Sequence, residues 1–394
     1  MRRRRTIAVA AALLGLVATA APAGAPASAA ERPAPRPAGV TVVGSGYGHG
    51  HGMSQWGAQG AAQRGLGTQA ILRFYYPTLK PGRATGNVSV LISGDTSPDL
   101  VVLDRPGLRV TALRGGRTTR LDRPTAARRW RLTPVSGGDA TLLEWRGATG
   151  GWKRSRTLPG EAQFGAGGAP ITLVTPVARR AYRGVLRSAR PTASSRTRDT
   201  VNVLPLESYL KGVVPREVYT SWHPAALRAQ AVAARTYAAF DRRDANARHY
   251  QICDTTQCQV YGGATDEVAS TNRAIDQTRH DVLTYRGQPA FTQFSASNGG
   301  QMAAGSQPYL VARKDPYDTA YRDWRDPVTA GEIERALPAI GSFRSVRVVA
   351  RDGKGAYGGR VVRVRVVGSR TSTVLSGDDF RSFFGLRSTL FRIG

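Results

Sequence analysis

Residues 201–240 read VNVLPLESYLKGVVPREVYTSWHPAALRAQAVAARTYAAF, a stretch that sets one acidic side chain between two helix-like segments. Residues 204–214 have the spacing of a short amphipathic helix, and Pro215 is expected to stop it because proline lacks a backbone donor. A second helix is predicted from a cap at Ser221, through Pro224 in its first turn, to about Phe240. Glu217 therefore falls between two helices, and spacing alone leaves it either a solvated loop carboxylate or a functional acid.

The same stretch carries a family resemblance. The strings VVPREV (213–218) and ALRAQAVAARTYA (226–238) resemble the signature of the SpoIID/LytB family of peptidoglycan lytic transglycosylases and cell-wall hydrolase modifiers. In that family the glutamate of the VVPxE segment is the catalytic acid. The resemblance therefore implies that Glu217 is catalytic.

A glycine-rich loop with two histidines begins the motif VGSGYGHGHGMSQWGAQG at residues 43–60. Such a loop brings backbone amides close to a ligand, and His49, His51, Gln55 and Trp56 add hydrogen-bonding groups and a flat apolar ring, which suits a sugar. A metal site is the weaker alternative, because no Cys or carboxylate follows at ligand spacing. A helix pair is predicted over residues 59–75. The motif resembles the family's GxGxGHGxGMSQxGA segment, which implies substrate contacts for His49 and Gln55.

The order of the motifs differs from the family pattern. Typical members carry the GHG motif near the C-terminus, whereas this chain carries it first. Residues 374–393, VLSGDDFRSFFGLRSTLFRI, resemble the piece that ordinarily precedes the motif. The resemblance thus implies a circularly permuted domain, in which residues near Gly44 and Gly394 lie close together.

The N-terminus has the pattern of a secretory signal peptide over residues 1–30, with four arginines, an apolar run and small residues at the end, followed by a Pro-rich linker over 31–39. We therefore expect a secreted, wall-associated protein with no membrane span after cleavage. The formal net charge is +29, from 56 Lys and Arg against 27 Asp and Glu. An exported polycation meets anionic wall polymers first, and since the basic residues are not gathered with aromatics, we expect no nucleic-acid partner. Besides wall binding and nucleic-acid binding, the charge has a third interpretation, in which it only keeps the protein soluble.

The fold class predicted is α+β: a SpoIID-like mixed core with circular permutation and a β-rich additional unit. The core would comprise the GHG segment (40–80) and residues 198–394, and the β-rich unit residues 87–190, where short alternating runs are separated by Gly, Pro and Asp clusters. Within the core we predict a helix over 265–278 capped by Thr265, strands over 281–285 and 290–296, and a hairpin from 345–350 and 360–367.

The chain has only two cysteines, Cys253 and Cys258, separated by four residues. In an oxidising compartment a disulfide across a tight loop is the simplest interpretation. Zinc is the alternative, but His249 with the two cysteines leaves the site one ligand short of four. No cofactor is otherwise expected.

Residues 291–301 read FTQFSASNGGQ, a polar strand end or loop. The family places a Ser-rich Gly-Gly segment beside its catalytic glutamate, so the resemblance implies sugar contacts for Gln293, Ser295 and Ser297. A serine hydrolase is not indicated, because the sequence has no Gly-x-Ser-x-Gly elbow.

Ordinary glycoside hydrolysis uses two carboxyl groups, and this sequence offers one good candidate. The resemblance implies a lytic transglycosylase, which cuts between N-acetylmuramic acid and N-acetylglucosamine and leaves 1,6-anhydro ends, since the muramic C6 hydroxyl attacks in place of water. Glu217 would serve as acid and then base, which requires a raised pKa. His49, Gln55, Gln293 and Ser295 would hold the strand. The alternatives are a noncatalytic wall-binding modifier that stimulates an N-acetylmuramoyl-L-alanine amidase, and a scaffold that displays its β-rich unit.

Overall fold

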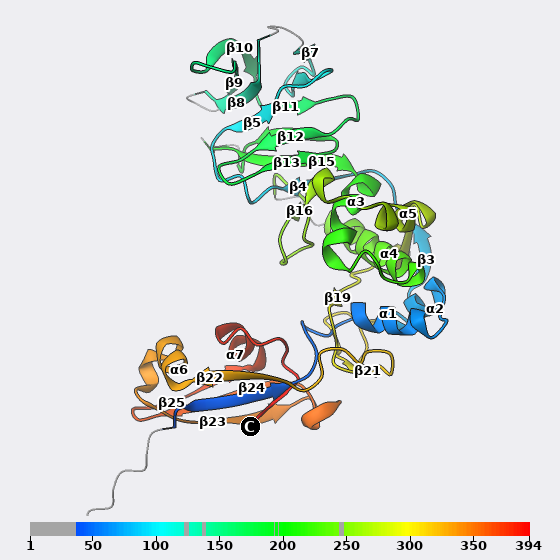
Figure 1. The fold of residues 1–394 in the computed structure, drawn as a ribbon, viewed down its shortest axis with the longest axis vertical. Helices are drawn as coiled ribbons and strands as arrows, with labels where there is room; N and C mark the ends of the chain where they lie inside the picture. Colours follow the sequence, from blue (N-terminus) through cyan, green and yellow to red (C-terminus); the bar gives the residue numbers. More distant parts are fainter. Residues whose placement is uncertain (1–36, 122–125, 136–138, 193, 196, 244–247) are drawn as a thin grey trace, which may run out of the picture. The chain divides into compact units, whose positions relative to one another are not determined.

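The computed structural model describes residues 37–121, 126–135, 139–192, 194–195, 197–243 and 248–394, which contain both helices and strands. The predicted signal peptide and most of the predicted linker lie outside the described residues. Figure 1 shows several sheets together with helices, in agreement with a mixed α+β fold. None of the helices among the described residues has the length and apolar character needed to cross a membrane.

Two large antiparallel sheets contain the strands predicted for the β-rich unit (Figure 1). In one, the order is β16 (Ile252–Cys253), β4 (Asn87–Leu91), β15 (Asp199–Pro205), β14 (Val185–Ala189), β11 (Ala162–Gly165), β6 (Arg109–Ala112) and β7 (Thr118–Arg120), with β16 parallel to β4. In the other, it is β10 (Lys153–Pro159), β9 (Ala140–Arg146), β8 (Arg129–Pro134), β5 (Leu100–Leu103), β12 (Ile171–Val174) and β13 (Arg179–Tyr182). Alternate residues of β4, Val88 and Val90, are buried, as expected for a strand with one face on the core.

The helix that precedes Glu217 is longer than predicted. Helix α3 (Leu206–Glu217) continues through Pro215, so Glu217 is its last residue rather than a loop residue. Pro215 is tolerated because it lies in the last turn, where it removes one intrahelical bond, and the amide of Val218 still closes the turn on Val214. Gly212 is required for packing, because a Cβ there would lie 2.6 Å from the ring of Tyr261.

Helix α4 (Pro224–Asp241) confirms the predicted second helix but begins differently. His223 caps it, accepting a hydrogen bond from the amide of Ala225 through Nδ1, so the Ser221 cap is wrong. Apolar residues that recur at spacings of three and four, Leu227, Ala231, Ala234 and Ala238, are buried in one hydrophobic cluster, and a second set of small residues on α4 joins another cluster. Since both of its faces are covered, α4 is a central element of the core.

The smaller elements follow the predicted pattern in part. The helix pair is α1 (Gln55–Gln63), capped by Ser54, and α2 (Thr68–Tyr75). Helix α5 (Ala269–Gln277) begins after Thr265, because the hydroxyl of Thr265 instead accepts the amide of Ala181. The strand predicted over 281–285 is β17 (Asp281–Tyr285), paired with β3 (Lys80–Arg83) and β18 (Gln288–Pro289). Of the strand predicted over 290–296, only β19 (Phe294–Ser295) forms, parallel to β2 (Met53–Ser54).

The C-terminal region joins the two ends of the described chain. Strand β1 (Gly39–Gly44) lies between β22 (Trp324–Thr329) and β26 (Phe391–Ile393), and the amide of Gly394 donates to Thr41 O at 2.7 Å. The expected proximity of the ends is therefore present, and the permutation itself stays a prediction. The predicted hairpin is β23 (Phe343–Arg351) with β24 (Val361–Gly368), extended by β25 (Ser372–Ser376) and packed with α6 (Ala330–Ala336) and α7 (Gly377–Phe383).

Candidate functional site

Glu217 lies where the end of α3 meets the start of α1. Its Oε1 accepts a hydrogen bond from the amide of Val260 at 3.1 Å, and its Oε2 lies 3.5 Å from Nε2 of Gln55. The side chain is partly buried. Burial raises the pKa of the Glu217 carboxyl, while the bonds from Val260 and Gln55 and the charge of Arg216 oppose that rise. The net effect is a carboxyl that keeps its proton to higher pH than an exposed glutamate.

His49 is held beside this carboxyl by the glycine-rich loop. Gly48 and Gly50 have positive φ angles of 106° and 76°, which explains why glycine stands on both sides of His49. Nδ1 of His49 accepts the amide of His51 at 2.9 Å, so the ring proton lies on Nε2. Burial, and after it the charges of His51 and two arginines, lowers the pKa of His49 to about 3. His49 is therefore neutral at physiological pH and acts as a hydrogen-bonding group rather than as a charge.

A cavity of about 210 Å³, called here the Glu217 cavity, brings together residues from five separate parts of the sequence. It contains three of the residues predicted from motifs, Glu217, His49 and Gln293. The remaining lining residues are Tyr237, Thr256, Gln257, Cys258, Val260 and Phe294. Gln55 contacts the carboxyl of Glu217 from a neighbouring cavity.

Ser295 and Ser297 occupy positions that differ from the prediction. The hydroxyl of Ser295 accepts the amide of Gly50 at 3.2 Å and so positions the His49 loop. Ser297 is fully buried, and its hydroxyl donates to Asp318 at 2.8 Å. Neither serine lines the Glu217 cavity, and the hydroxyl of Ser297 is committed to the protein interior. We therefore assign Ser295 a positioning role and no longer assign Ser297 a sugar contact.

Two aspartates that the sequence analysis missed hold these loops together. Asp318 accepts hydrogen bonds from Ser54 Oγ at 2.8 Å and from the amide of Asn298 at 2.7 Å, and burial raises its pKa. Asp315 accepts from Tyr75 at 2.8 Å and from the side-chain amide of Asn298 at 2.7 Å. The available signal was the string KDPYD, in which two aspartates flank a turn proline.

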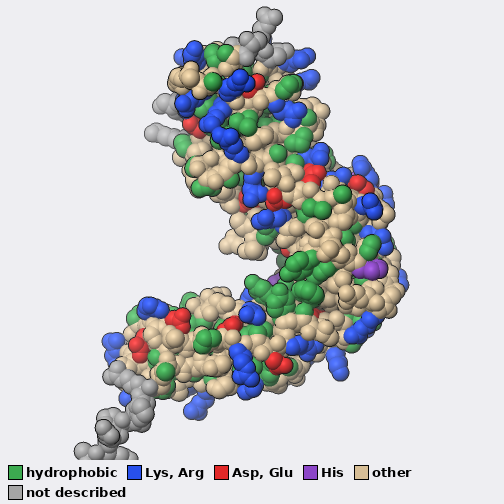
Figure 2. All heavy atoms as spheres, in the orientation of Figure 1, with side chains coloured by type: hydrophobic (Ala, Val, Ile, Leu, Met, Phe, Trp, Pro, Cys, Tyr) green, Lys and Arg blue, Asp and Glu red, His purple; other side chains and the backbone are tan. Residues whose placement is uncertain are grey.

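An aromatic cluster borders Glu217 on the side of Gln55. It consists of Trp56, Tyr219, Trp222 and Tyr321, and centroid distances from the Trp56 ring to the other three are 5.0–6.4 Å. Tyr219 is 60% exposed. These rings line a second cavity together with Gln55, Arg216 and Glu217. Figure 2 shows hydrophobic side chains gathered into a patch on the visible face, while Lys and Arg are spread over the surface.

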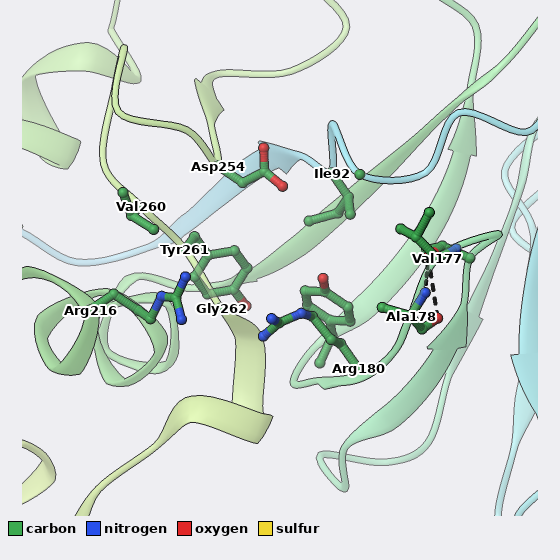
Figure 3. Close-up of a pocket in the computed structure, with 12 residues that line it drawn as sticks. Ile92, Val177, Ala178, Arg180, Arg216, Asp254, Val260, Tyr261 and Gly262 are labelled. Atoms are coloured by element: carbon green, nitrogen blue, oxygen red, sulfur yellow. Dashed lines mark hydrogen bonds between the residues drawn. The ribbon is translucent and has the colours of Figure 1, made fainter. Parts of the chain in front are cut away.

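A third cavity continues from Arg216. Figure 3 shows Arg216 and Arg180 reaching into it from opposite sides, near the ring of Tyr261. Both guanidinium groups approach the same carboxylate, Asp266, at 3.3 Å and 3.2 Å. Asp254 also lines this cavity, and its carboxylate accepts the hydroxyl of Ser93. Arg216 therefore connects this polar cavity with the aromatic cluster.

The two cysteines are joined in a disulfide, Cys253–Cys258, with 5.5 Å between their Cα atoms. His249 is bonded instead to Asp199, with 2.7 Å between Nε2 and Oδ2. Across the described ranges, no group of three or more His, Cys, Asp or Glu residues is arranged to hold a metal ion. The residues of the zinc alternative therefore do not fit a zinc site, because both thiols are used in the disulfide.

A partly buried carboxyl with aromatic rings on one side and hydrogen-bonding side chains on the other has the mixture of apolar and polar groups found in ligand-binding sites. Residues 194–285 match the family model of Stage II sporulation protein, SpoIID. The amidase enhancer of Bacillus subtilis is 42% identical over 115 residues, which is 28% of this chain and 15% of that protein. Stage II sporulation protein D of the same organism is 30% identical over 222 residues, 49% of this chain and 61% of that protein.

An uncharacterized protein of Brachyspira hyodysenteriae is 41% identical over 113 residues, 28% of this chain and 31% of that protein. In each case the match spans less than two thirds of the relative's length. These matches confirm, over residues 194–285, the resemblance to the SpoIID/LytB family that the motifs at 213–238 predicted.

Proposed function

We propose that this protein binds peptidoglycan glycan strands and cleaves them as a lytic transglycosylase. The observation that carries the proposal is the isolation of Glu217. Among the residues described, it is the one carboxyl group that lines either the Glu217 cavity or the cavity of the aromatic cluster. A two-carboxyl glycosidase mechanism therefore lacks its second group at this site.

A transglycosylase needs a single acid and base. Glu217, protonated because burial raises its pKa, gives its proton to the glycosidic oxygen as the bond to C1 of the muramic residue breaks. The resulting carboxylate takes the proton of the muramic C6 hydroxyl, whose oxygen bonds to C1 and closes the 1,6-anhydro ring. The amide of Val260 and Nε2 of Gln55 stabilise the carboxylate between the two proton transfers.

The residues around Glu217 support glycan binding on both sides of the scissile bond. Neutral His49 and the side chain of Gln293 line one cavity, where they suit the N-acetyl and hydroxyl groups of a sugar. On the other side, the exposed ring of Tyr219 offers an apolar face to a pyranose ring.

A second candidate function is a noncatalytic modifier that binds the strands and stimulates an amidase. The likeness to the Bacillus subtilis amidase enhancer favours it. Both functions use the same glycan-binding surface, and they differ in whether the carboxyl of Glu217 is needed.

Mass spectrometry of glycan strands, with and without stem peptides, separates the two. We expect anhydro-muramic ends from the wild type, and a loss of about 10²–10⁴-fold in their rate of formation with Glu217→Gln. Glu332→Gln, a helix-capping carboxylate outside both cavities, is the matched control and should keep full activity. Strands that bind both wild type and Glu217→Gln but are cut by neither would establish the modifier instead.

We further propose that the protein is exported to the cell wall. There the net charge, which is +25 once the four arginines of the predicted signal peptide are taken from the +29 of the full sequence, favours anionic wall polymers, and an amidase is the expected protein partner if the modifier function holds.

A further inference from the structure

A cavity of about 390 Å³ adjoins the Glu217 cavity, and His49 lines both. It is called here the Arg360 cavity. Its walls come from parts of the chain that are distant in sequence, with His51 and Ala303 near the shared histidine and Lys354, Arg360 and Thr389 beyond them. The Arg360 cavity is therefore a neighbour of the Glu217 cavity, with His49 common to both.

The guanidinium of Arg360 is buried without an ion pair. Arg360 is 6% exposed; its Nη2 donates to Asn298 O at 3.0 Å and its Nη1 to Thr389 Oγ1 at 3.3 Å. Its Nε is buried and has no hydrogen-bond partner. No carboxylate in the described part of the chain lies within ion-pair distance of this side chain. The guanidinium also touches the His49 loop, since a Cβ on Gly50 would lie 2.0 Å from Nη2.

Burial and the charge of Arg381 lower the pKa of Arg360 to about 10. The carboxylates of Asp352, Asp378 and Asp318 favour the charged form of Arg360 through space, but none forms an ion pair with it. Asp352 lines the cavity, but its Oδ1 already accepts the backbone amides of Lys354 and Arg360. Asp378 also lines it and is exposed to solvent. Lys354 adds a positive charge, and His49 is neutral. A buried cation bonded only to neutral groups is costly, and an anion from a ligand would remove that cost.

We propose that the Arg360 cavity binds a carboxylate carried on the muramic residue of the glycan strand. This inference rests on the proposed glycan-binding function. The shared chemistry is a carboxylate attached through the lactyl ether, which is either the lactyl carboxylate itself or that of a peptide linked to it. A neutral N-acetylglucosamine residue offers no such group, so the cavity sets which sugar lies beside His49.

The test compares three tetrasaccharides of alternating N-acetylglucosamine and N-acetylmuramic acid by calorimetric titration. One carries free lactyl carboxylates, one carries them as neutral methyl amides, and one carries the dipeptide L-alanyl-D-isoglutamine. All titrations use the full chain with Glu217→Gln, so that no strand is cut. We expect at least one acidic form to bind about tenfold or more tightly than the amide, because charge-assisted bonds to a guanidinium are the strong ones. Whichever acidic form shows the preference identifies the source of the carboxylate.

Adding Arg360→Gln is expected to remove the preference for the acid while leaving the affinity for the amide. Arg351→Gln is the matched control, because Arg351 bonds to the carbonyls of Gly359 and Phe391 and does not line the cavity. A second measurement needs no change at Arg360: the ¹⁵N and ¹H resonances of its Nε–H should shift on adding the acid and not the amide.

Equal affinity for acid and amide, binding of none of the three, or a preference that survives Arg360→Gln would each overturn the proposal. If Arg360→Gln does not fold, an unmoved Nε–H resonance overturns it instead. Because binding is measured without cleavage, a wild type that fails to make anhydro ends leaves this outcome unaffected.

Discussion

Among single residues, the proton on Glu217 links the chemistry of the site to the stability of the fold. Burial raises the pKa of this carboxyl in the folded protein above its ordinary value of 4.5. Between pH 4.5 and the raised pKa of the folded state, the folded protein holds more protons than the unfolded protein. Its stability therefore falls as pH rises through that window. At neutral pH, above the ordinary value of 4.5, the wild type is therefore less stable than it would be with this carboxyl protonated in both states.

Glu217→Gln removes that loss of stability, so we expect the variant to be more stable than the wild type at pH 7. The difference should shrink as pH falls and vanish below about pH 4, where the carboxyl is protonated in both states. Urea unfolding of the two proteins at both pH values measures it. A variant that is less stable at pH 7, or a difference independent of pH, would mean that the pKa of Glu217 is not raised.

The residues around Glu217 could be predicted from the sequence where a short motif carries them. Glu217, His49 and Gln293 come from separate motifs, and the structure gathers them around one cavity. Ser297 belongs to the same motif as Gln293, but its side chain is fully buried and its hydroxyl donates to Asp318. Asp318 itself gave no signal, since a buried carboxylate that accepts several hydrogen bonds looks like any turn aspartate in the sequence.

The aromatic cluster shows a different limit. Trp56 was noted as a flat ring suited to a sugar, but its partners Tyr219, Trp222 and Tyr321 come from segments that meet only in the fold. Exposure was equally hidden, because an aromatic residue after a helix is more often buried than 60% exposed like Tyr219.

Among the helices, α3 and α4 are joined by a buried ion pair. Arg235 is fully buried, and its Nε and Nη2 donate to the two carboxylate oxygens of Glu207 at 2.9 Å and 2.8 Å. Nη2 of Arg235 also donates to Ile275 O, on α5. The ion pair therefore holds α3 to α4 at the start of α3, the end opposite Glu217, and neither residue lines the candidate site.

Removing Glu207 should leave a buried, uncompensated guanidinium. We expect Glu207→Ala to lower the free energy of unfolding by about 3–5 kcal/mol. Asp276→Ala is the control, because its pair with Lys211, at 3.1 Å, is half-exposed and should be worth less than about 1 kcal/mol. Chemical denaturation of both variants provides the measurement, and equal losses would contradict the role given to the buried pair.

The helices were predicted better in their bodies than at their ends. Small apolar residues recur at spacings of three and four along α4, a pattern that is typical of a helix. The body of the helix agrees with this pattern because the core covers both of its faces. The predicted ends were wrong for local reasons. Pro215 removes only one hydrogen bond when it lies in the last turn, so α3 continues through it. The imidazole of His223, and not Ser221, caps α4. The strand predicted over 290–296 is shorter in the structure because the amides of Thr292 and Gln293 bond within the segment, to Ala290 O and Phe291 O, instead of to a neighbouring strand.

In the whole molecule, the N-terminal segment of the described chain is joined to the C-terminal part by strand pairing. β1 pairs with β22 and β26, β2 with β19, and β3 with β17. Such long-range pairings leave no local pattern in the sequence, and only the order of the family motifs suggested them. If this order reflects a circular permutation, β26 and β1 must lie close enough for a short connection to join them.

In the unpermuted order, β26 would lead directly into β1. The two strands are antiparallel neighbours with Ile393 opposite Val42, so a short turn from Gly394 to Gly39 would join them as a hairpin. We therefore expect a chain with this joint, and with new ends between β14 and β15, to fold with a melting temperature within a few degrees of the parent and to bind glycan strands as tightly. Circular dichroism and strand sedimentation check both.

The same joint with the chain opened inside α4 is the control, and it should fail to fold because α4 is packed on two clusters. If the first chain also fails, the join between β26 and β1 is not equivalent to the native arrangement, and the motif order must have another origin. If it folds and binds, the pairing of β1 with β26 and β22 is sufficient to position the GHG loop without the present order of the chain. That outcome is expected because the loop bonds to residues distant in sequence, with the amide of Gly48 donating to Arg387 O and the amide of Gly50 to Ser295 Oγ.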